Sequence, residues 1–303
     1  MSDEAPGAAA QKLEELGLRL GPDIDYDFDK MFPKLTGWGA KGEIKQKHKL
    51  ITLVEPLLRR LLRPNERVLY VAKGVQSKFS EQYFLGAWGA ALINQTVFVL
   101  TNVRLLTLHS DTKGKPQHQY WMIFYNQIKK FKGTWTGTLA LDLNDGLKLR
   151  FSGFRGTDRK QMPEIFQGVL DAYVTAGFNP SVTQSRENLC SHCLTVVPKD
   201  QYVCPSCGEE FWRPMQLALR SLVFPSWGDF TMRHTTVACL ELFGYIVTWL
   251  MFVSFIIEAL GDPARAIVVT AIFLVSLAIE HSVDAALTYH IAKKGLNAKR
   301  RPA

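Results

Sequence analysis

Four of the five cysteines form the set of residues best suited to chemistry in this chain. They stand in two Cys-x-x-Cys pairs with ten residues between them. Each pair can form a tight turn that points two thiolates at one metal ion, and two such turns complete the closed tetrahedral set of a structural zinc site. Four thiolates leave no open coordination position. The spacing therefore predicts one structural Zn²⁺, bound by Cys190, Cys193, Cys204 and Cys207.

Disulfide bonds and a redox pair are the alternative interpretations of these cysteines. Thiols that face the cytoplasm stay reduced, and a thioredoxin-like site would need a single Cys-x-x-Cys on a βαβ frame. With Gly208 after the second pair and Phe211 and Trp212 as apolar cover, residues 188–212 resemble the zinc-ribbon family. The resemblance implies a small zinc-ribbon domain over 186–213.

Two long apolar runs near the C-terminus have the length of membrane-crossing helices. Residues 235–260 carry only Glu241 and Glu258 as charges, and residues 266–291 form a second such run. About 20 apolar residues in a helix cross the hydrocarbon layer, and the short Gly-Asp-Pro-Ala-Arg connection permits only a hairpin. Two buried core helices are the alternative, but core helices seldom stay apolar on every face. The sequence predicts a transmembrane hairpin over 235–291.

The charges beside these runs predict their orientation. Arg265 is the only basic residue in the connection, whereas basic residues precede the first run and follow the second, at Arg233, Lys293, Lys294, Lys299, Arg300 and Arg301. Because basic flanks stay on the cytoplasmic side, we expect both termini to be cytoplasmic, with 292–303 as a basic cytoplasmic tail. The amphipathic segment 214–230 predicts a helix lying in the membrane interface.

Polar side chains inside the apolar runs form a candidate intramembrane cluster. Glu241 in the first run falls level with Glu280, His281 and Asp284 in the second. Ionisable groups inside a membrane often mark proton or ion paths. A helical rise of 1.5 Å per residue, however, puts them roughly 20 Å or more from the connection, near the inner interface, where headgroups and water satisfy them. We favour this structural role over a metal or proton site.

The segment before the cysteines carries strand signals followed by a helix. Asn144-Asp145-Gly146 is a strong hairpin turn signal, and after Gly156 apolar residues recur at helical spacing. The strand signals occupy Arg67–Ala72, Gln95–Leu108, Tyr120–Phe131 and Thr138–Phe151. The pattern predicts six or seven antiparallel strands and one C-terminal helix, preceded by a helical and basic segment over 1–64.

Three short motifs resemble the bacterial pleckstrin-homology and GRAM-like domains. They are the opening strand Pro64–Ala72, the Leu-Thr-Asn-x-Arg-Leu hairpin within Val99–Leu106 and the strand start Tyr125–Ile128. The resemblance implies a pleckstrin-homology-like β-barrel or sandwich over 65–180 that meets lipid or protein, and a place at a bacterial inner membrane.

An uncharged run, Tyr83–Ile93, interrupts this domain between its first two strands. In the resembled family the first inter-strand loop often faces the ligand or the membrane. This gives candidate contact residues at Lys73, Lys78, Phe84, Leu85 and Trp88. We favour the alternative that the run packs as an inserted helix or a core strand, because an apolar run by itself does not separate burial from membrane insertion.

The net charge of +8 fits either nucleic acid or anionic lipid as a partner. Beside a membrane anchor, lipid is the better fit, and we expect no nucleic acid. The sequence lacks a phosphate-binding Gly-rich loop, an HExxH helix and a GxSxG elbow. We therefore expect a multi-domain, non-catalytic binding or scaffold protein anchored in the membrane, with lipids and either a protein partner or copies of itself. The alternative is an accessory subunit of an oligomeric channel or transport assembly, in which the hairpin is the functional part.

Overall fold

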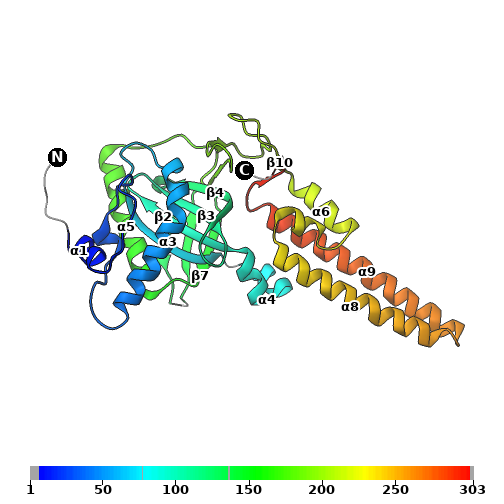
Figure 1. Cartoon of the computed structure of the whole chain (residues 1–303). Helices are drawn as coiled ribbons and strands as arrows, with labels where there is room; N and C mark the ends of the chain where they lie inside the picture. The colour runs from blue at the N-terminus through cyan, green and yellow to red at the C-terminus, as the bar shows by residue number, and fades with distance from the viewer. Residues whose placement is uncertain (1–6, 77, 136, 301–303) are drawn as a thin grey trace.

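A nine-stranded antiparallel sheet forms the body of the protein. The computed structural model describes residues 7–76, 78–135 and 137–300 (Figure 1). Within these residues the strands stand in the order β5-β6-β7-β1-β2-β3-β4-β8-β9. Their bounds are β1 (Val68–Gln76), β2 (Gln95–Thr101), β3 (Arg104–Ser110), β4 (Pro116–Phe124), β5 (Ile128–Gly133), β6 (Leu139–Leu143), β7 (Lys148–Ser152), β8 (Glu187–Leu189) and β9 (Val196–Val197).

The hairpins of this sheet lie where local sequence signals predicted them. β2 turns into β3 at Thr101–Asn102, and Asn102 Oδ1 accepts a hydrogen bond from the Arg67 amide at 2.8 Å. β6 turns into β7 at Gly146, whose φ of 85° suits glycine. The antiparallel sheet and the helix after it, α5 (Gly156–Ala176), are as predicted. β8 and β9, from the predicted zinc-ribbon segment, extend the same sheet.

Helices cover both faces of the sheet. Neighbouring residues of β2 point to opposite faces, so that Val97 and Val99 belong to one apolar core and Phe98 and Leu100 to the other. The N-terminal helices α1 (Ala8–Glu15), α2 (Phe28–Met31) and α3 (Ala40–Leu61) pack on the first core, and α5 packs on the second. The basic N-terminal segment thus covers the sheet with its apolar side.

The uncharged run between β1 and β2 is an inserted helix, α4 (Phe79–Ile93). The helix is kinked at Gly86, where φ is 69° and ψ is 164°. Its end is buried at Ala90 and Ile93, whereas Trp88 is 63% exposed. The run is therefore a helix and not a core strand, and α4 contacts the first long C-terminal helix. Phe84 and Trp88 stay exposed, so contact of this helix with lipid remains a prediction.

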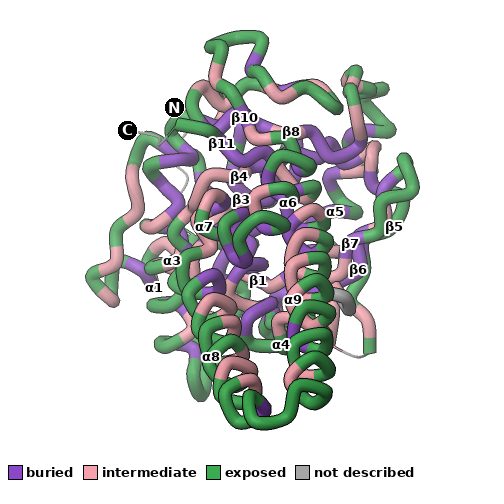
Figure 2. The backbone as a smooth tube through the Cα atoms, turned by 90° about the vertical axis from the view of Figure 1, so that its right-hand side faces the viewer, coloured by how far each residue is buried: buried purple, intermediate pink, exposed green. Residues whose placement is uncertain are grey.

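Two long helices project from the sheet as a hairpin: α8 (Thr235–Ala259) and α9 (Pro263–Ala292). Among the described residues, these two helices are long and apolar enough to cross a membrane, with mean hydropathy values of 2.0 and 2.1. Only 0% and 6% of their most apolar stretches are buried, whereas core helices would be mostly covered. Figure 2 shows the burial concentrated in the sheet and the hairpin exposed along most of its length.

The predicted interfacial helix over 214–230 is wrong in one respect, because the structure divides it into α6 (Pro214–Val223) and α7 (Trp227–Met232). Pro225 and the left-handed Ser226 (φ 65°) break the helix. α6 packs along α9 through Leu217 and Ser221, both fully buried.

The chain beyond α9 is also not a free basic tail. Its residues Asn297–Ala298 form β11, which pairs antiparallel with β10 (Phe211–Trp212) behind the second cysteine pair. Figure 1 shows the segment after α9 returning to β10. Residues 301–303 of the predicted tail lie outside the described residues.

Candidate functional site

The four predicted cysteines lie together in one cluster. Their Sγ atoms are all within 4.8 Å of one another, with 3.7 Å between Cys190 and Cys207 and 3.5 Å between Cys193 and Cys204. A tetrahedral site with metal–sulfur bonds of about 2.3 Å has sulfur–sulfur edges of about 3.8 Å. The cluster fits a metal ion of this kind, and the thiols are free cysteines and not disulfides.

Two equivalent turns position these thiols. The residue after each pair, Leu194 or Gly208, is left-handed, with φ values of 63° and 72°. The amide of each donates a 3.0 Å hydrogen bond to the carbonyl of the first cysteine of its pair. Gly208 adopts this conformation without cost, whereas Leu194 is strained. The two turns bring both pairs to the same point.

The apolar cover over the cysteines comes from two segments that are far apart in the sequence. Phe211, predicted as apolar cover, is buried against Cys190 and Cys204. Leu296 and Ala298, from the segment after α9, belong to the same core. No sequence signal predicted that Leu296 and Ala298 cover the cysteines, because these two residues lie in a short basic segment.

The five predicted membrane-contact residues do not form one surface. Lys73 donates to the Thr112 carbonyl and lines a cavity with Lys47 and Asp158. Lys78 lines a different cavity, whereas Phe84 and Leu85 line a third, beside the hairpin. Trp88 is exposed on α4. The candidate contact set is therefore divided among three places.

Three of the four predicted intramembrane residues line one cavity. This cavity of about 330 Å³ is lined by Glu241, Glu280 and Asp284 together with apolar groups of α4. His281 bonds through Nδ1 to the Leu222 carbonyl at 2.7 Å and lies 3.3 Å from the Tyr245 hydroxyl.

Asp229, which the sequence analysis missed, joins this group from α7. A carboxylate oxygen of each of Asp229, Glu241 and Asp284 lies within 4.8 Å of the others. In the sequence, Asp229 is a lone acid between Trp227 and Phe230. This pattern is typical of an exposed residue on an interfacial helix, so it does not indicate a site.

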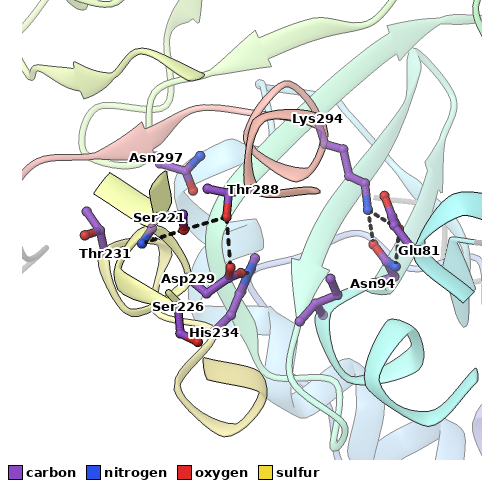
Figure 3. A network of polar contacts seen from close by, with 12 residues as sticks. Glu81, Asn94, Ser221, Ser226, Asp229, Thr231, His234, Thr288, Lys294 and Asn297 are labelled. Carbon is purple, nitrogen blue, oxygen red and sulfur yellow. Dashed lines mark hydrogen bonds and ion pairs between the residues drawn. The ribbon is translucent and has the colours of Figure 1, made fainter. Parts of the chain in front are cut away.

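Asp229 also belongs to a buried network that binds α7 to α9 (Figure 3). Thr288 donates to its Oδ2 at 3.2 Å, and His234 Nδ1 lies 3.3 Å from its Oδ1. Ser221 bonds Thr288 at 2.9 Å and accepts from the Gly228 amide at 3.1 Å. A Cβ at Gly228 would lie 2.4 Å from Thr288 Cγ2, so only glycine permits this approach.

A second buried network connects α4 to the residues that follow α9 (Figure 3). Lys294 Nζ donates to Glu81 Oε2 at 2.6 Å, and Asn94 Nδ2 donates to the same oxygen at 2.7 Å. Burial lowers the pKa of Lys294 to about 8, an effect that the charge of Glu81 opposes. Lys294 and Glu81 are 213 residues apart in sequence, and no local pattern predicts their pairing.

Comparison with known proteins gives little that bears on this arrangement. No protein-family model and no curated protein matches the chain. A solved structure, the C-terminal domain of an unknown protein from Leishmania infantum, aligns at 13% sequence identity with a TM-score of 0.26. The alignment covers 39% of this chain and 90% of that one. A likeness at this TM-score carries no argument about fold or function.

Proposed function

We propose that the chain is a non-catalytic binding protein that holds a pleckstrin-homology-like domain against the cytoplasmic face of a bacterial inner membrane. The order of elements supports the domain, because seven antiparallel strands, β1 to β7, precede the single helix α5. The strands β8 and β9 and the inserted α4 are additions to that plan. The four thiols close to one another support a zinc ribbon that stiffens the segment between the sheet and the hairpin.

The observation that carries this proposal is the connection of the hairpin to the sheet domain at its inner end. β11 pairs with β10, and Lys294 pairs with Glu81 of α4. Gly295 lies against Trp121 of β4 so closely that a Cβ there would be 2.6 Å from the indole. One of these contacts reaches β4 of the sheet and the other two reach α4 and β10, so the sheet domain cannot swing freely on its anchor. This geometry suits a protein that presents one surface at a fixed height and angle above the bilayer.

Single-cysteine labelling of intact cells tests the anchor and its orientation. A cysteine replacing Asp262, in the connection between α8 and α9, should react with an impermeant maleimide in intact cells whose outer membrane is permeabilised. A cysteine replacing Lys113, exposed in the β3–β4 loop, should react only after lysis. Labelling at position 113 in intact cells would overturn the orientation, and extraction of the protein by alkaline carbonate would overturn the anchor.

A second candidate function is favoured by the acids of the hairpin. Asp229, Glu241 and Asp284 approach one another beside the 330 Å³ cavity, and acids at membrane depth often serve ion or proton transfer. A hairpin encloses little lumen alone, so this function requires copies or partners around it. Crosslinking in cells before mild solubilisation separates the candidates. A ring of identical subunits supports an oligomeric transport assembly, whereas a complex with a different protein supports the binding role.

A further inference from the structure

A cavity of about 170 Å³ lies between the sheet and the segment that follows α9. The charged residues of its described lining are five cations and one carboxylate: Lys78, Lys148, Arg186, Lys293, Lys294 and Asp145. The cations come from the residue before α4, from β7, from the residue before β8 and from the segment directly after α9, and Asp145 lies in the β6–β7 turn. The fold, and not a local run of basic residues, brings these like charges together. Their mutual repulsion is unfavourable unless an anion is present.

Arg186 is the most unusual member of this lining. Its side chain lies over the Trp121 ring with 3.8 Å between the guanidinium carbon and the ring centroid, and the residue is only 8% exposed. No ion pair with a carboxylate is found for it among the described residues, and its Nε is a buried donor without a hydrogen-bond partner. Buried arginines are normally paired. A cation–π contact recovers only part of the cost of removing the charge from water.

Other groups of the cavity lack an acceptor or are already engaged. Gln184 Nε2 is a second buried donor without a partner in the described chain. Lys294 is paired with Glu81, outside the lining. Asp145 stabilises its own hairpin turn, where its Oδ1 accepts from the Leu147 amide at 3.0 Å. The carboxylate in the wall therefore has a local role, and Arg186 remains available to an anion from outside.

In the proposed orientation, the cavity lies at or beyond the cytoplasmic headgroup layer. Lys293 and Lys294 directly follow Ala292, the last residue of α9. The 30 residues of α9 span about 45 Å, more than the hydrocarbon layer of about 30 Å. With its far end across the membrane, the end at Ala292 reaches or passes the cytoplasmic headgroup layer.

We propose that this cavity binds a phosphate group, carried either by an anionic lipid headgroup or by a free phosphate compound. The inference deepens the proposed function, on which its lipid form rests. Arg186 offers planar paired donors that match phosphate oxygens, and the lysines add point charges around it. The Trp121 ring fixes the guanidinium in place before the anion arrives, so little side-chain entropy is lost on binding.

Two matched variants test the site in the full-length protein. Arg186→Met keeps the stem over Trp121 and removes the charge, and we expect it to weaken phosphate binding roughly ten- to a hundredfold. Lys148 is exposed on β7, so Lys148→Ala should leave the fold intact and weaken binding about fivefold. Lys130→Ala, an equally exposed lysine on β5 outside the lining, removes the same charge and should have no effect.

The measurements use two probes that separate the sources of phosphate. Inorganic phosphate is titrated by calorimetry into protein in a zwitterionic detergent, an arm that does not depend on topology or membrane insertion. Native mass spectrometry then follows lipid retained from nanodiscs containing phosphatidylglycerol or only phosphatidylcholine. The proposal is supported if the protein binds phosphate or selectively retains phosphatidylglycerol, and if Arg186→Met and Lys148→Ala weaken this binding but Lys130→Ala does not. If neither probe binds, or if Lys130→Ala weakens binding as much as Lys148→Ala, the site is refuted. If Arg186→Met does not fold, the difference in phosphate binding between Lys148→Ala and Lys130→Ala decides whether this cavity is the site.

Discussion

Replacing Lys294 by methionine should loosen α4 from the segment that follows α9. The Lys294 and Glu81 side chains are 8% and 0% exposed, and their charged atoms are 2.6 Å apart. Methionine keeps the length of the lysine stem and removes its charge. It leaves the Glu81 carboxylate buried, with Asn94 as the remaining donor to Oε2 and no partner for Oε1 in the described chain.

The size of the effect follows from this burial. Breaking one side of a buried ion pair costs about 3–5 kcal/mol, because an uncompensated charge stays inside. Glu81→Gln should cost less, since a neutral amide needs no counter-charge. The double variant should cost less than the sum of the two single variants, by about 1–3 kcal/mol of coupling. Lys293→Met, the same change at the exposed neighbouring residue, is the matched control.

Hydrogen exchange by mass spectrometry in a zwitterionic detergent measures the opening of α4 directly. At 1.36 kcal/mol per factor of ten, exchange of the Phe79–Ile93 amides should accelerate by roughly two to three and a half orders of magnitude in Lys294→Met. Exchange in β2 and β3 should stay unchanged, because their cores do not include this pair. Equal exchange in Lys294→Met and Lys293→Met, or strictly additive effects in the double variant, would refute the reasoning.

Two further predictions concern the metal and the packing of α7. Elemental analysis of reduced, chelator-free protein should find one zinc per chain. The Cys204→Ser variant should lose the zinc, and its residues 188–212 should become sensitive to protease. The control Cys239→Ser, in α8, should keep the zinc. Protein without zinc would contradict the ribbon, whose folding depends on metal binding energies of about 10–16 kcal/mol. Gly228→Ala should destabilise the protein by about 1–3 kcal/mol through its clash with Thr288, read as a lower melting temperature. Gly244→Ala, where a Cβ meets nothing within 4 Å, is its control, and equal melting temperatures would show that α7 does not pack against α9 as described.

The features that the sequence predicted well are those whose signal is local. The strand signals and the turn at Gly146 depend on neighbouring residues, and so do the two cysteine pairs. Glu81 and Lys294 carry no comparable signal, since one resembles an exposed acid in the first turn of a helix and the other a positive flank of a membrane span. Their pairing depends on the path of the whole chain. The same holds for β11, whose two residues become a strand only because β10 lies beside them.

The position of β11 makes the cysteine cluster and the α8–α9 hairpin parts of one structure. Ala298 lies in the same apolar core as Cys190 and Cys204, and it pairs with Phe211 behind the second cysteine pair. The segment from Lys293 to Asn297 therefore spans from the end of α9 to this core, with Gly295 against Trp121 on the way. A segment of five residues reaches at most about 18 Å, so α9 cannot tilt far from the sheet unless β11 leaves β10. Without a metal, the turns that carry β10 would lose their order, and with them this restraint. A flexible tether would need none of these contacts, and their presence supports the proposal that the sheet domain is held in a set orientation relative to the hairpin.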